Sequence, residues 1–476
     1  MLLFLSLAMA RPLTLDDALQ MAQEANPQLS GANYDLKAAE ARAMAARGTF
    51  DPYVSLSAGR NFSVREGSFQ GLETFTETTS LFWNAQLGQT LPSGTTWALE
   101  SSNSSSLFYF NIQELNIEDE QASQGDAGLT LTLSQQLLEG HRMAYNLENV
   151  RQAEAARDMA EARLWSQRQT ILLETSRAWN ELAYADAALL VAERALEVAS
   201  EERRIVNAQV EAGNLAPVEA TRVEAAVAQA QLAVIEARNA RAAANDALGI
   251  QVGAIGEQWE PTDPSVSVPS LDLDADRAVA STLDGNPNLQ LARLQVQDAE
   301  GSLVASRHAM LPSLSLDARF GYSGFEQVDD GTLFDGAALS RDKLATGDFP
   351  DRYVGATFSV PLGMRAERGA LGAATANVGS QQSALLTQEN ALTTQTLSLV
   401  RSLETAQQRI ALAELNLRLA KETLAAEKAR QEAGRAVQKD VLEAQRAVTD
   451  AEVQLLRART DYQNALAELM ALQGKL

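Results

Sequence analysis

An internal repeat constrains the fold of this 476-residue chain more than any other feature of its sequence. The motif NPQL at residues 26–29 recurs as NPNL at residues 286–289, at an offset of 260 residues. Pro52 recurs as Pro312 at the same offset. Because these landmarks keep both their order and their spacing, we expect the two halves of the chain to contain the same elements in the same order.

Each half contains a helical run that is too long for an ordinary globular domain. The first run covers residues 141–212, and within it Leu182, Leu189 and Leu196 recur every seven residues. A sustained period of seven predicts helices that supercoil against neighbouring helices. As one helix, these 72 residues are about 108 Å long.

Shorter helices, each about half as long, accompany the long ones. The predicted short helices cover residues 14–47 and 215–248 in the first half and residues 275–308 and 437–470 in the second half, whose long helix covers residues 366–433. Each half is therefore expected to pair one long helix with two short helices stacked end to end. The residue before a proline disfavours helix, so the two Asn-Pro pairs are expected to kink or restart the short helices.

The sequence EAG ends both long helices, at residues 211–213 and 432–434. Glycine commonly ends a helix because it adopts positive φ without strain, so we expect a reverse turn at each position. Pro217 follows the first glycine by four residues, where it suits the first turn of the next helix. Gln438 occupies the equivalent position in the second half.

Segments in which apolar and polar residues alternate lie between the short and the long helices. Such alternation puts one face on apolar surroundings and the other on water, and in an exported protein it is typical of membrane β-barrel strands. The alternating apolar positions are Val54, Leu56 and Ala58; Leu129, Leu131 and Leu133; Leu314, Leu316 and Phe320; and Val354, Ala356, Phe358 and Val360. Two further strand-like runs flank a tight turn at residues 92–94.

The first half thus has four predicted strands and the second half two. A closed single-chain membrane barrel needs at least about eight strands, so several chains must contribute. Stretches rich in glycine, serine and acidic residues, at 65–77, 102–126 and 324–351, are predicted to be external loops. Whether the additional hairpin around residues 92–94 joins the barrel or folds outside it stays open.

The composition excludes several classes of function. The chain has a formal net charge of −23 and no cysteine, so nucleic-acid binding, a disulfide, a thiolate metal site and a catalytic thiol are not expected. The two histidines, His141 and His308, lack an acidic or histidine partner at ligand spacing, and we interpret both as structural. No catalytic, cofactor or metal site is predicted, and the chain is not expected to be an enzyme.

The N-terminal ten residues, MLLFLSLAMA, form a short apolar run that ends in small residues. This pattern fits the end of a secretory signal peptide, and the alternative is a frayed apolar tail. No other stretch reaches the roughly 18 apolar residues that a membrane-spanning helix needs. The predicted organisation is a signal-peptide remnant at 1–10, a first repeat at 11–249, a linker at 250–270 and a second repeat at 271–476.

Several segments together carry a resemblance to a known family. They are LTLDDALQMAQEANPQL, AEARAMAARGTFDPYVSLS, LTLTLSQQLLEG, SVPLG and GRAVQKDVLEAQ. In this order, they resemble the TolC-like outer-membrane efflux proteins, also called outer membrane factors, over residues 13–474. No single segment identifies the family, but the order of these segments, repeated in both halves, is specific to it.

The resemblance implies a mainly α fold with β structure, in which a long antiparallel coiled-coil α-barrel continues a transmembrane β-barrel assembled from several chains. It implies a homotrimer in the bacterial outer membrane, with the helical part in the periplasm. The partners would be outer-membrane lipid, a periplasmic adaptor protein and an inner-membrane transporter. The chain would then serve as a passive duct for efflux or secretion.

The resemblance also assigns candidate site residues. The tips of the two helical hairpins, which would meet the adaptor, are Gly213, Asn214, Leu215, Gly434, Arg435 and Ala436. In the family, acids six and nine residues after a glycine line the narrow periplasmic entrance. Here Asp440 and Glu443 follow Gly434 at those spacings as a bare pair of carboxylates, whereas Glu219 and Arg222 occupy the equivalent places in the first repeat.

Other interpretations remain beside this one. Acids three residues apart are common on solvated helical faces, so Asp440 and Glu443 need not line an entrance. A periplasmic coiled-coil adaptor or structural spacer without a membrane pore would account for the heptads, but not for alternating strands at equivalent places in both repeats. A porin-like channel without a transporter partner would not need such long helices.

Overall fold

The computed structural model describes residues 11–69, 72–112, 117–213, 215–262, 274–433 and 438–476, so the predicted signal-peptide remnant lies outside the described residues. The chain divides into two compact units. The helical unit comprises residues 1–37, 158–294 and 383–476, and the sheet unit comprises residues 38–157 and 295–382. Each unit therefore combines segments from both halves of the chain.

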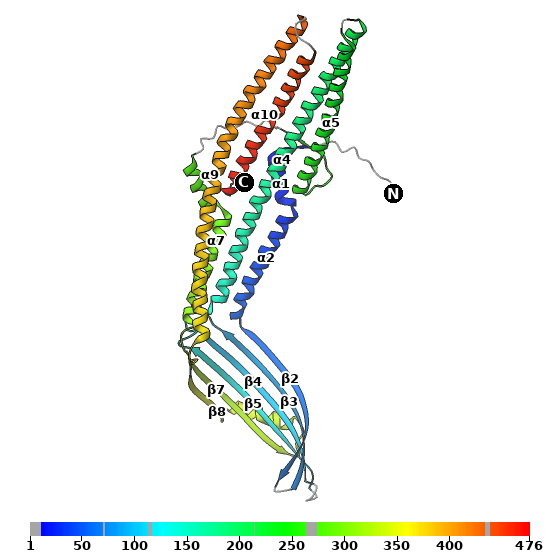
Figure 1. Ribbon diagram of the computed structural model, residues 1–476. Helices are drawn as coiled ribbons and strands as arrows, with labels where there is room; N and C mark the ends of the chain where they lie inside the picture. Colours follow the sequence, from blue (N-terminus) through cyan, green and yellow to red (C-terminus); the bar gives the residue numbers. More distant parts are fainter. Residues whose placement is uncertain (1–10, 70–71, 113–116, 214, 263–273, 434–437) are drawn as a thin grey trace, which may run out of the picture. The chain divides into compact units, whose positions relative to one another are not determined.

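The two halves contain the same kinds of element in the same order, which confirms the predicted repeat (Figure 1). The first half contains β1 (Arg11–Leu13), α1 (Leu15–Ala25), α2 (Pro27–Arg47), the short 3-10 helix η1 (Gly48–Phe50), β2 (Tyr53–Phe69), β3 (Leu72–Thr90), β4 (Thr95–Ile112), β5 (Ile117–Gln136), α3 (Met143–Asn146), α4 (Glu148–Glu211) and α5 (Pro217–Gln251). After β6 (Trp259–Pro261) come α6 (Ala275–Gly285), α7 (Pro287–His308), β7 (Ser313–Asp329), α8 (Asp335–Thr346), β8 (Pro350–Ser359), α9 (Arg365–Glu432) and α10 (Gln438–Leu472).

The helices lie close to the ranges that the heptad pattern predicts. The long helices α4 and α9 contain 64 and 68 residues, and the helices α5 and α10 that follow them contain 35 residues each. The predicted start of the first long helix at residue 141 is wrong, because α3 precedes α4 as a separate turn. Leu147, with φ of −83° and ψ of 2°, separates the two helices.

The Asn-Pro pairs interrupt both half-length helices, as predicted. Asn26 and Asn286 have extended backbones, with ψ of 122° and 120°, because a following proline disfavours the helical conformation. The side chain of each asparagine caps the restarted helix: Asn26 Oδ1 accepts from the N–H of Gln28 at 2.9 Å, and Asn286 Oδ1 accepts from that of Asn288 at 3.0 Å.

The same two side chains hold the ends of the helices that return from the hairpins. Asn26 Nδ2 donates to the carbonyl oxygen of Gln251 at 3.0 Å, and Asn286 Nδ2 donates to that of Leu472 at 2.9 Å. Both asparagines are only 4% exposed. Each repeat therefore uses one buried side chain to join the end of its returning helix to the break between its short helices.

Three apolar clusters lie in the core of the helical unit, and the smallest contains Ala22, Leu29 and Ile171. The first joins α1, α4, α5 and β6 through Ala18, Trp179, Leu182, Leu248 and Trp259, and the second joins α9 and α10 through Leu403, Ile410, Leu455, Tyr462 and Leu469. The seven-residue spacing on each long helix supplies these positions, as the sequence predicts. Among the described residues, no helix combines the length and the apolar composition that crossing a membrane requires.

The six long strands of the sheet unit form one antiparallel sheet in the order β2-β3-β4-β5-β7-β8 (Figure 1). The additional hairpin, β3 and β4, therefore lies inside the sheet and not beside it. Gly94 closes its tight turn with a φ of +78° and a 3.0 Å hydrogen bond from its N–H to the carbonyl of Leu91.

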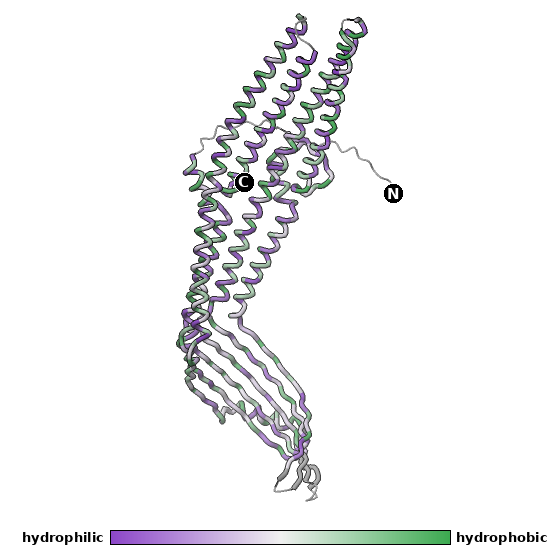
Figure 2. The backbone as a smooth tube through the Cα atoms, in the orientation of Figure 1, coloured by the Kyte–Doolittle hydropathy of each residue, from purple (hydrophilic) through white to green (hydrophobic). Residues whose placement is uncertain are grey.

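The two faces of the sheet differ in polarity, as the alternation predicts, and Figure 2 shows the alternation of hydropathy along the strands. Cross-strand pairs place side chains of the same character on the same side. The apolar face carries Leu56, Ala85, Leu87, Leu99, Leu131, Leu133, Leu316, Phe320, Val354 and Phe358, and the polar face carries Ser57, Asn84, Ser102, Ser104, Thr130, Thr132, Ser315 and Asp317.

The predicted external loops are largely wrong. Within 65–77 and 102–126, most described residues belong to strands, because the backbone ladder continues through the serine- and threonine-rich segments. The hydroxyl oxygens of Ser80 and Ser106, for example, lie 2.8 Å apart on paired strands. Polar composition indicates a loop only where no partner strand is present, and here hairpin pairing supplies the partner.

The third predicted loop, 324–351, contains the helix α8 and the ends of β7 and β8. The segment Ala337-Ala338-Leu339 favours helix. Asp335 Oδ2 accepts from the N–H of Thr332 at 2.7 Å, and Gly347, with φ of +71°, ends the helix. Many of the glycines and acids that resemble a loop in the sequence flank this helix, whereas Asp335, Gly336 and Asp342 lie within it.

The buried asparagines give a test of the fold. Asn286→Ala should lower the free energy of unfolding of the helical unit by roughly 1–3 kcal/mol, because it leaves the carbonyl of Leu472 without the hydrogen bond from this buried side chain. The midpoint of urea unfolding, followed by helical circular dichroism in detergent, measures this change. The exposed variant Asn239→Ala on α5 is the control, and equal midpoints for both variants would contradict the capping role.

Candidate functional site

The first hairpin tip is a glycine turn followed by a proline-started helix. Gly213 has a φ of +76° and donates its N–H to the carbonyl of Val210 at 3.0 Å. Pro217 is the first residue of α5, as predicted, and Ala216 before it is extended. Gly213 is exposed and Leu215 half-buried, whereas Asn214 lies outside the described residues.

The second tip lies between α9, which ends at Glu432, and α10, which begins at Gln438. The candidate tip residues Gly434, Arg435 and Ala436 lie outside the described residues. Their assignment to the tip therefore stays a prediction from the sequence.

Asp440 and Glu443 lie on the first turns of α10. Asp440 is half-buried, and Glu443 is exposed. The expectation of a bare pair is wrong for Glu443, because its Oε1 lies 3.4 Å from Nζ of Lys439, one helical turn earlier. The sequence contains this i, i+4 spacing, which brings opposite charges together on a helix.

Glu219, the acid of the first repeat that is equivalent to Asp440, has a basic partner at a shorter distance than Glu443 has. Glu219 Oε1 accepts a 2.6 Å hydrogen bond from Nη1 of Arg222 within α5. Glu219 Oε2 is buried and has no hydrogen-bond partner in the part of the chain that the structure describes. The two hairpins thus differ in charge near their tips, as the sequence indicates.

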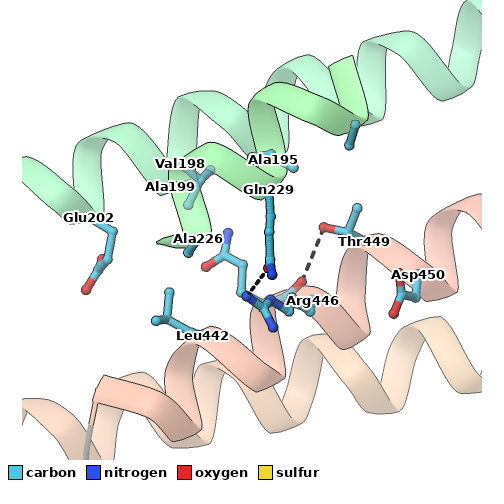
Figure 3. Close-up of a pocket in the computed structure, with 13 residues that line it drawn as sticks. Ala195, Val198, Ala199, Glu202, Ala226, Gln229, Leu442, Arg446, Thr449 and Asp450 are labelled. Atoms are coloured by element: carbon cyan, nitrogen blue, oxygen red, sulfur yellow. Dashed lines mark hydrogen bonds between the residues drawn. The ribbon is translucent and has the colours of Figure 1, made fainter. Parts of the chain in front are cut away.

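Two polar contacts connect the hairpins near these tips. Gln438 is only 5% exposed, and its Nε2 donates to Glu202 of α4 while its Oε1 accepts from Gln431 of α9. Further along α10, Arg446 donates to the side-chain oxygen of Gln229 on α5 (Figure 3). The second hairpin is therefore tied to both helices of the first.

A groove lies between the hairpins at this level, and Figure 3 shows the residues that line it. Its volume is about 180 Å³. Small side chains from α4 and α5 form one wall, and residues of α10 form the other; they include Ala195, Ala199, Ala226, Ala230, Leu442 and Thr449. The sequence does not predict this groove or the polar contacts beside it, although Gln438 is distinguished in the sequence because it occupies the position equivalent to Pro217.

The two histidines belong to the sheet unit and lie near each other, which their separation in the sequence does not indicate. Nη1 of Arg142 lies 3.4 Å from Nε2 of His308. The pKa of His308 is lower than its ordinary value. Partial burial is the largest cause, and the positive charge of Arg142 and the charge of His141 add to it. Within the described residues, no group of three or more histidine, cysteine or acidic side chains could hold a metal ion.

A comparison with models of known protein families identifies the family of this chain. The family model described as outer membrane efflux protein matches residues 18–254 and 278–475, which include both repeats. The chain belongs to the outer membrane efflux protein family. No curated protein matches the chain.

Solved structures of outer-membrane channels share the fold of this efflux protein. The outer membrane protein VceC of Vibrio cholerae matches with a TM-score of 0.66 and 18% identity over 97% of this chain and 96% of its own. The CmeC channel of Campylobacter jejuni matches with a TM-score of 0.66 and 16% identity, over 97% of this chain and 86% of its own. The MtrE channel of Neisseria gonorrhoeae, in its open state, has a TM-score of 0.64 and 18% identity, over 97% and 88%.

Family membership gives the general function and location. The chain is an efflux channel of the outer membrane with a periplasmic helical part, and it is a transport protein rather than an enzyme. The predicted fold class, mainly α with a β-sheet and built from two repeats, is confirmed.

The contact between the hairpins gives a second test. Gln438→Ala removes the hydrogen bond to Glu202, and we expect roughly tenfold faster amide hydrogen exchange over residues 438–446, since a hydrogen bond to a charged group contributes about 1.5–3 kcal/mol. Hydrogen exchange read by mass spectrometry measures the effect. Asp450→Ala, which is exposed on α10 beyond this segment, is the control, and equal exchange in both variants would show that Gln438 does not tie the hairpins.

The histidine contact gives a third test, which is simple to read because the chain has only two histidines. Arg142→Gln should raise the pKa of His308 toward its ordinary value, and a pH titration of the histidine NMR signals measures it. Arg163→Gln on α4 should leave this pKa unchanged.

The native arrangement also has a pH consequence with a definite sign. Because the pKa of His308 is lower in the folded chain than in the unfolded chain, the unfolded state binds more protons between the two values. Stability from this group is therefore present above about pH 6.5 and is lost as the pH falls toward the folded-state pKa. The prediction would be contradicted if the free energy of unfolding of the native protein rose on acidification while that of the Arg142→Gln variant did not.

Proposed function

We propose that three copies of the chain form one passive duct that crosses the outer membrane and the periplasm. Each copy contributes six strands, so three copies times six strands give one barrel of eighteen strands. The helices continue the duct in the periplasm, where the hairpin tips dock with an adaptor protein and an inner-membrane transporter. Transport needs no chemistry in the channel itself.

The observation that carries this proposal is the pair of open edges of the sheet. In the described part of the chain, β2 and β8 each pair with a strand on one side only. Inside a bilayer, unpaired backbone N–H and C=O groups cost several kcal/mol each, so strands cross membranes only as closed barrels. With six strands, pairing of β8 with β2 of the next copy is the simplest way to close the sheet.

The exposed apolar side chains of the helices support association of copies. Leu386, Leu412 and Leu419 on α9 are exposed, and so are Leu232 and Ile235 on α5. Exposed apolar residues at helical spacing indicate surfaces that pack against further helices. Neighbouring copies would cover them.

The alternative, a periplasmic spacer without a pore, is less consistent with the sheet. A soluble spacer would need to cover the apolar face, where Leu56, Val354 and Phe358 are exposed. A barrel places that face in lipid and leaves the serine- and threonine-rich face on a water-filled lumen.

The carboxylates near the second tip would form the periplasmic entrance. In a trimer, Asp440 and Glu443 of each copy make six acids that converge on the axis, where they attract cations and narrow the opening. Lys439 offsets part of the charge of Glu443, so Asp440 is expected to dominate the interaction with cations.

Single-channel conductance in a planar bilayer tests the proposed channel and its entrance together. The native protein should form pores of small conductance that a trivalent cation blocks from the periplasmic side. Asp440→Asn with Glu443→Gln should weaken the block by about tenfold or more, because the converging charges are lost.

Asp35→Asn with Glu40→Gln is the matched control, since both acids are exposed on α2 and removing them changes the charge by the same amount. This control should keep the native block. Pores whose block is the same in all variants would place the entrance elsewhere, and the absence of any pore would remove the channel proposal.

A further inference from the structure

The helix α8 lies on the apolar face of the sheet, against β4, β5 and β7. The N–H of Gly336 donates to Oγ of Ser123 at 3.1 Å, and Arg341 donates to Oδ1 of Asn103 at 3.2 Å. The strand alternation puts Ser123 on the same face as Leu129 and Leu131. The helix therefore covers part of the face that the proposed barrel turns toward lipid.

The part of this face that α8 covers is polar. Asn103, Ser105 and Ser123 are buried under α8, and the hydroxyl of Ser105 donates to the carbonyl of Leu333 just before the helix. Buried polar groups without partners are costly. The helix and its flanking residues supply partners for Oδ1 of Asn103 and for the hydroxyls of Ser105 and Ser123, so these contacts hold α8 against the sheet.

Glycines allow the helix to approach the strands closely. A Cβ on Gly125 would come within 2.1 Å of the carbonyl oxygen of Gly336, and a Cβ on Gly324 within 2.0 Å of that of Ser340. No side chain fits at either position. The contact is thus built into the backbone of β5, β7 and α8.

The position of α8 along the strands indicates its depth in a membrane. On β5 the apolar residues of this face run from Ala127 to Leu133, which is about 20 Å along the strand. Ser123, under α8, lies beyond this stretch on the side of the β4–β5 hairpin, away from the strand ends that connect to the periplasmic helices. Asn103, which is also under α8, pairs with Ala127 at the end of this stretch, so the helix covers the hairpin-side end of the apolar stretch of β5 and the residues beyond it.

The exposed side chains around α8 are of two kinds. Phe334 and Phe349, on either side of the helix, are 66% and 53% exposed, and Trp83 and Tyr322 on the sheet nearby are also partly exposed. Aromatic side chains of this kind form the belts at membrane interfaces. The helix itself carries the exposed carboxylate of Asp342, which hydrocarbon would not accept without a large cost.

We propose that α8 is an interfacial helix whose exposed surface lies among the lipid headgroups of the outer leaflet, with Phe334 and Phe349 as anchors at its ends. Continuity of this surface with the apolar face of the sheet supports lipid as the occupant. The proposal rests on the proposed function, because it needs the sheet to cross the membrane. It assigns to α8 the role of fixing the depth of the barrel.

Site-specific fluorescent labels test the depth, and the absence of cysteine from the chain makes single-cysteine variants straightforward. Phe334→Cys and Phe349→Cys report on α8, Leu131→Cys on the apolar band and Thr132→Cys on the polar face. Each variant carries a fluorophore and is inserted into phosphatidylcholine vesicles with a nitroxide quencher either at the headgroup or in the middle of the acyl chain.

The labels on α8 should lose more fluorescence with the headgroup nitroxide, and the label at residue 131 should lose more with the acyl-chain nitroxide. The label at residue 132 should respond weakly to both. If residue 131 is quenched but the α8 labels respond to neither quencher, or mainly to the acyl-chain nitroxide, the helix is not interfacial and the proposal is wrong. If no label is quenched, the sheet does not enter the membrane and the proposed function itself fails.

Discussion

Unpaired backbone groups on the two edge strands are the constraint on which the rest of the structure depends. Within the described residues, β2 and β8 have a hydrogen-bonding neighbour on one side only. An open sheet with one apolar face is stable neither in water, which the apolar face avoids, nor in lipid, which leaves the edge groups unpaired. Closure of the sheet with further copies would pair the backbone groups of the edge strands. Because the family is located in the outer membrane, the apolar face would then contact lipid.

The helices follow from the same requirement. A barrel built from copies needs those copies held in register, and the long helices α4 and α9 carry apolar heptads that can pack on their neighbours. Within one chain, Asn26 and Asn286 join the returning helices to the helix breaks by the same hydrogen bonds in both repeats. The repeat therefore gives each copy two nearly equivalent helical hairpins.

The two hairpins differ near their tips, where the periplasmic entrance of the proposed duct would lie. In the first repeat Pro217 starts α5 and Glu219 is paired with Arg222. In the second repeat Gln438 starts α10 and contacts Glu202, and the nearby Asp440 forms no ion pair with a described residue. The second hairpin is thus held by hydrogen bonds that can exchange, whereas proline makes the start of the first returning helix rigid.

The sequence predicts those elements whose signals are local and periodic. The heptad pattern predicts the helices, and the Asn-Pro pairs predict where the short helices break. The alternation of apolar and polar residues predicts the number of strands. The lengths of the strands and the helix α8 are not predictable in this way, because pairing with a neighbouring strand overrides loop-like composition. The contacts of Gln438 with Glu202 and of Arg142 with His308 join residues 236 and 166 positions apart, and no spacing rule reaches so far.

Electron cryo-microscopy of the purified protein in lipid nanodiscs tests the proposed trimeric barrel, because one reconstruction shows both the number of chains and the number of strands. We expect three chains and a single closed barrel of eighteen strands, six from each chain, with β8 of each copy paired to β2 of the next. A barrel in which the β3–β4 hairpin is excluded, or a sheet that stays open at β2 and β8, would contradict this expectation.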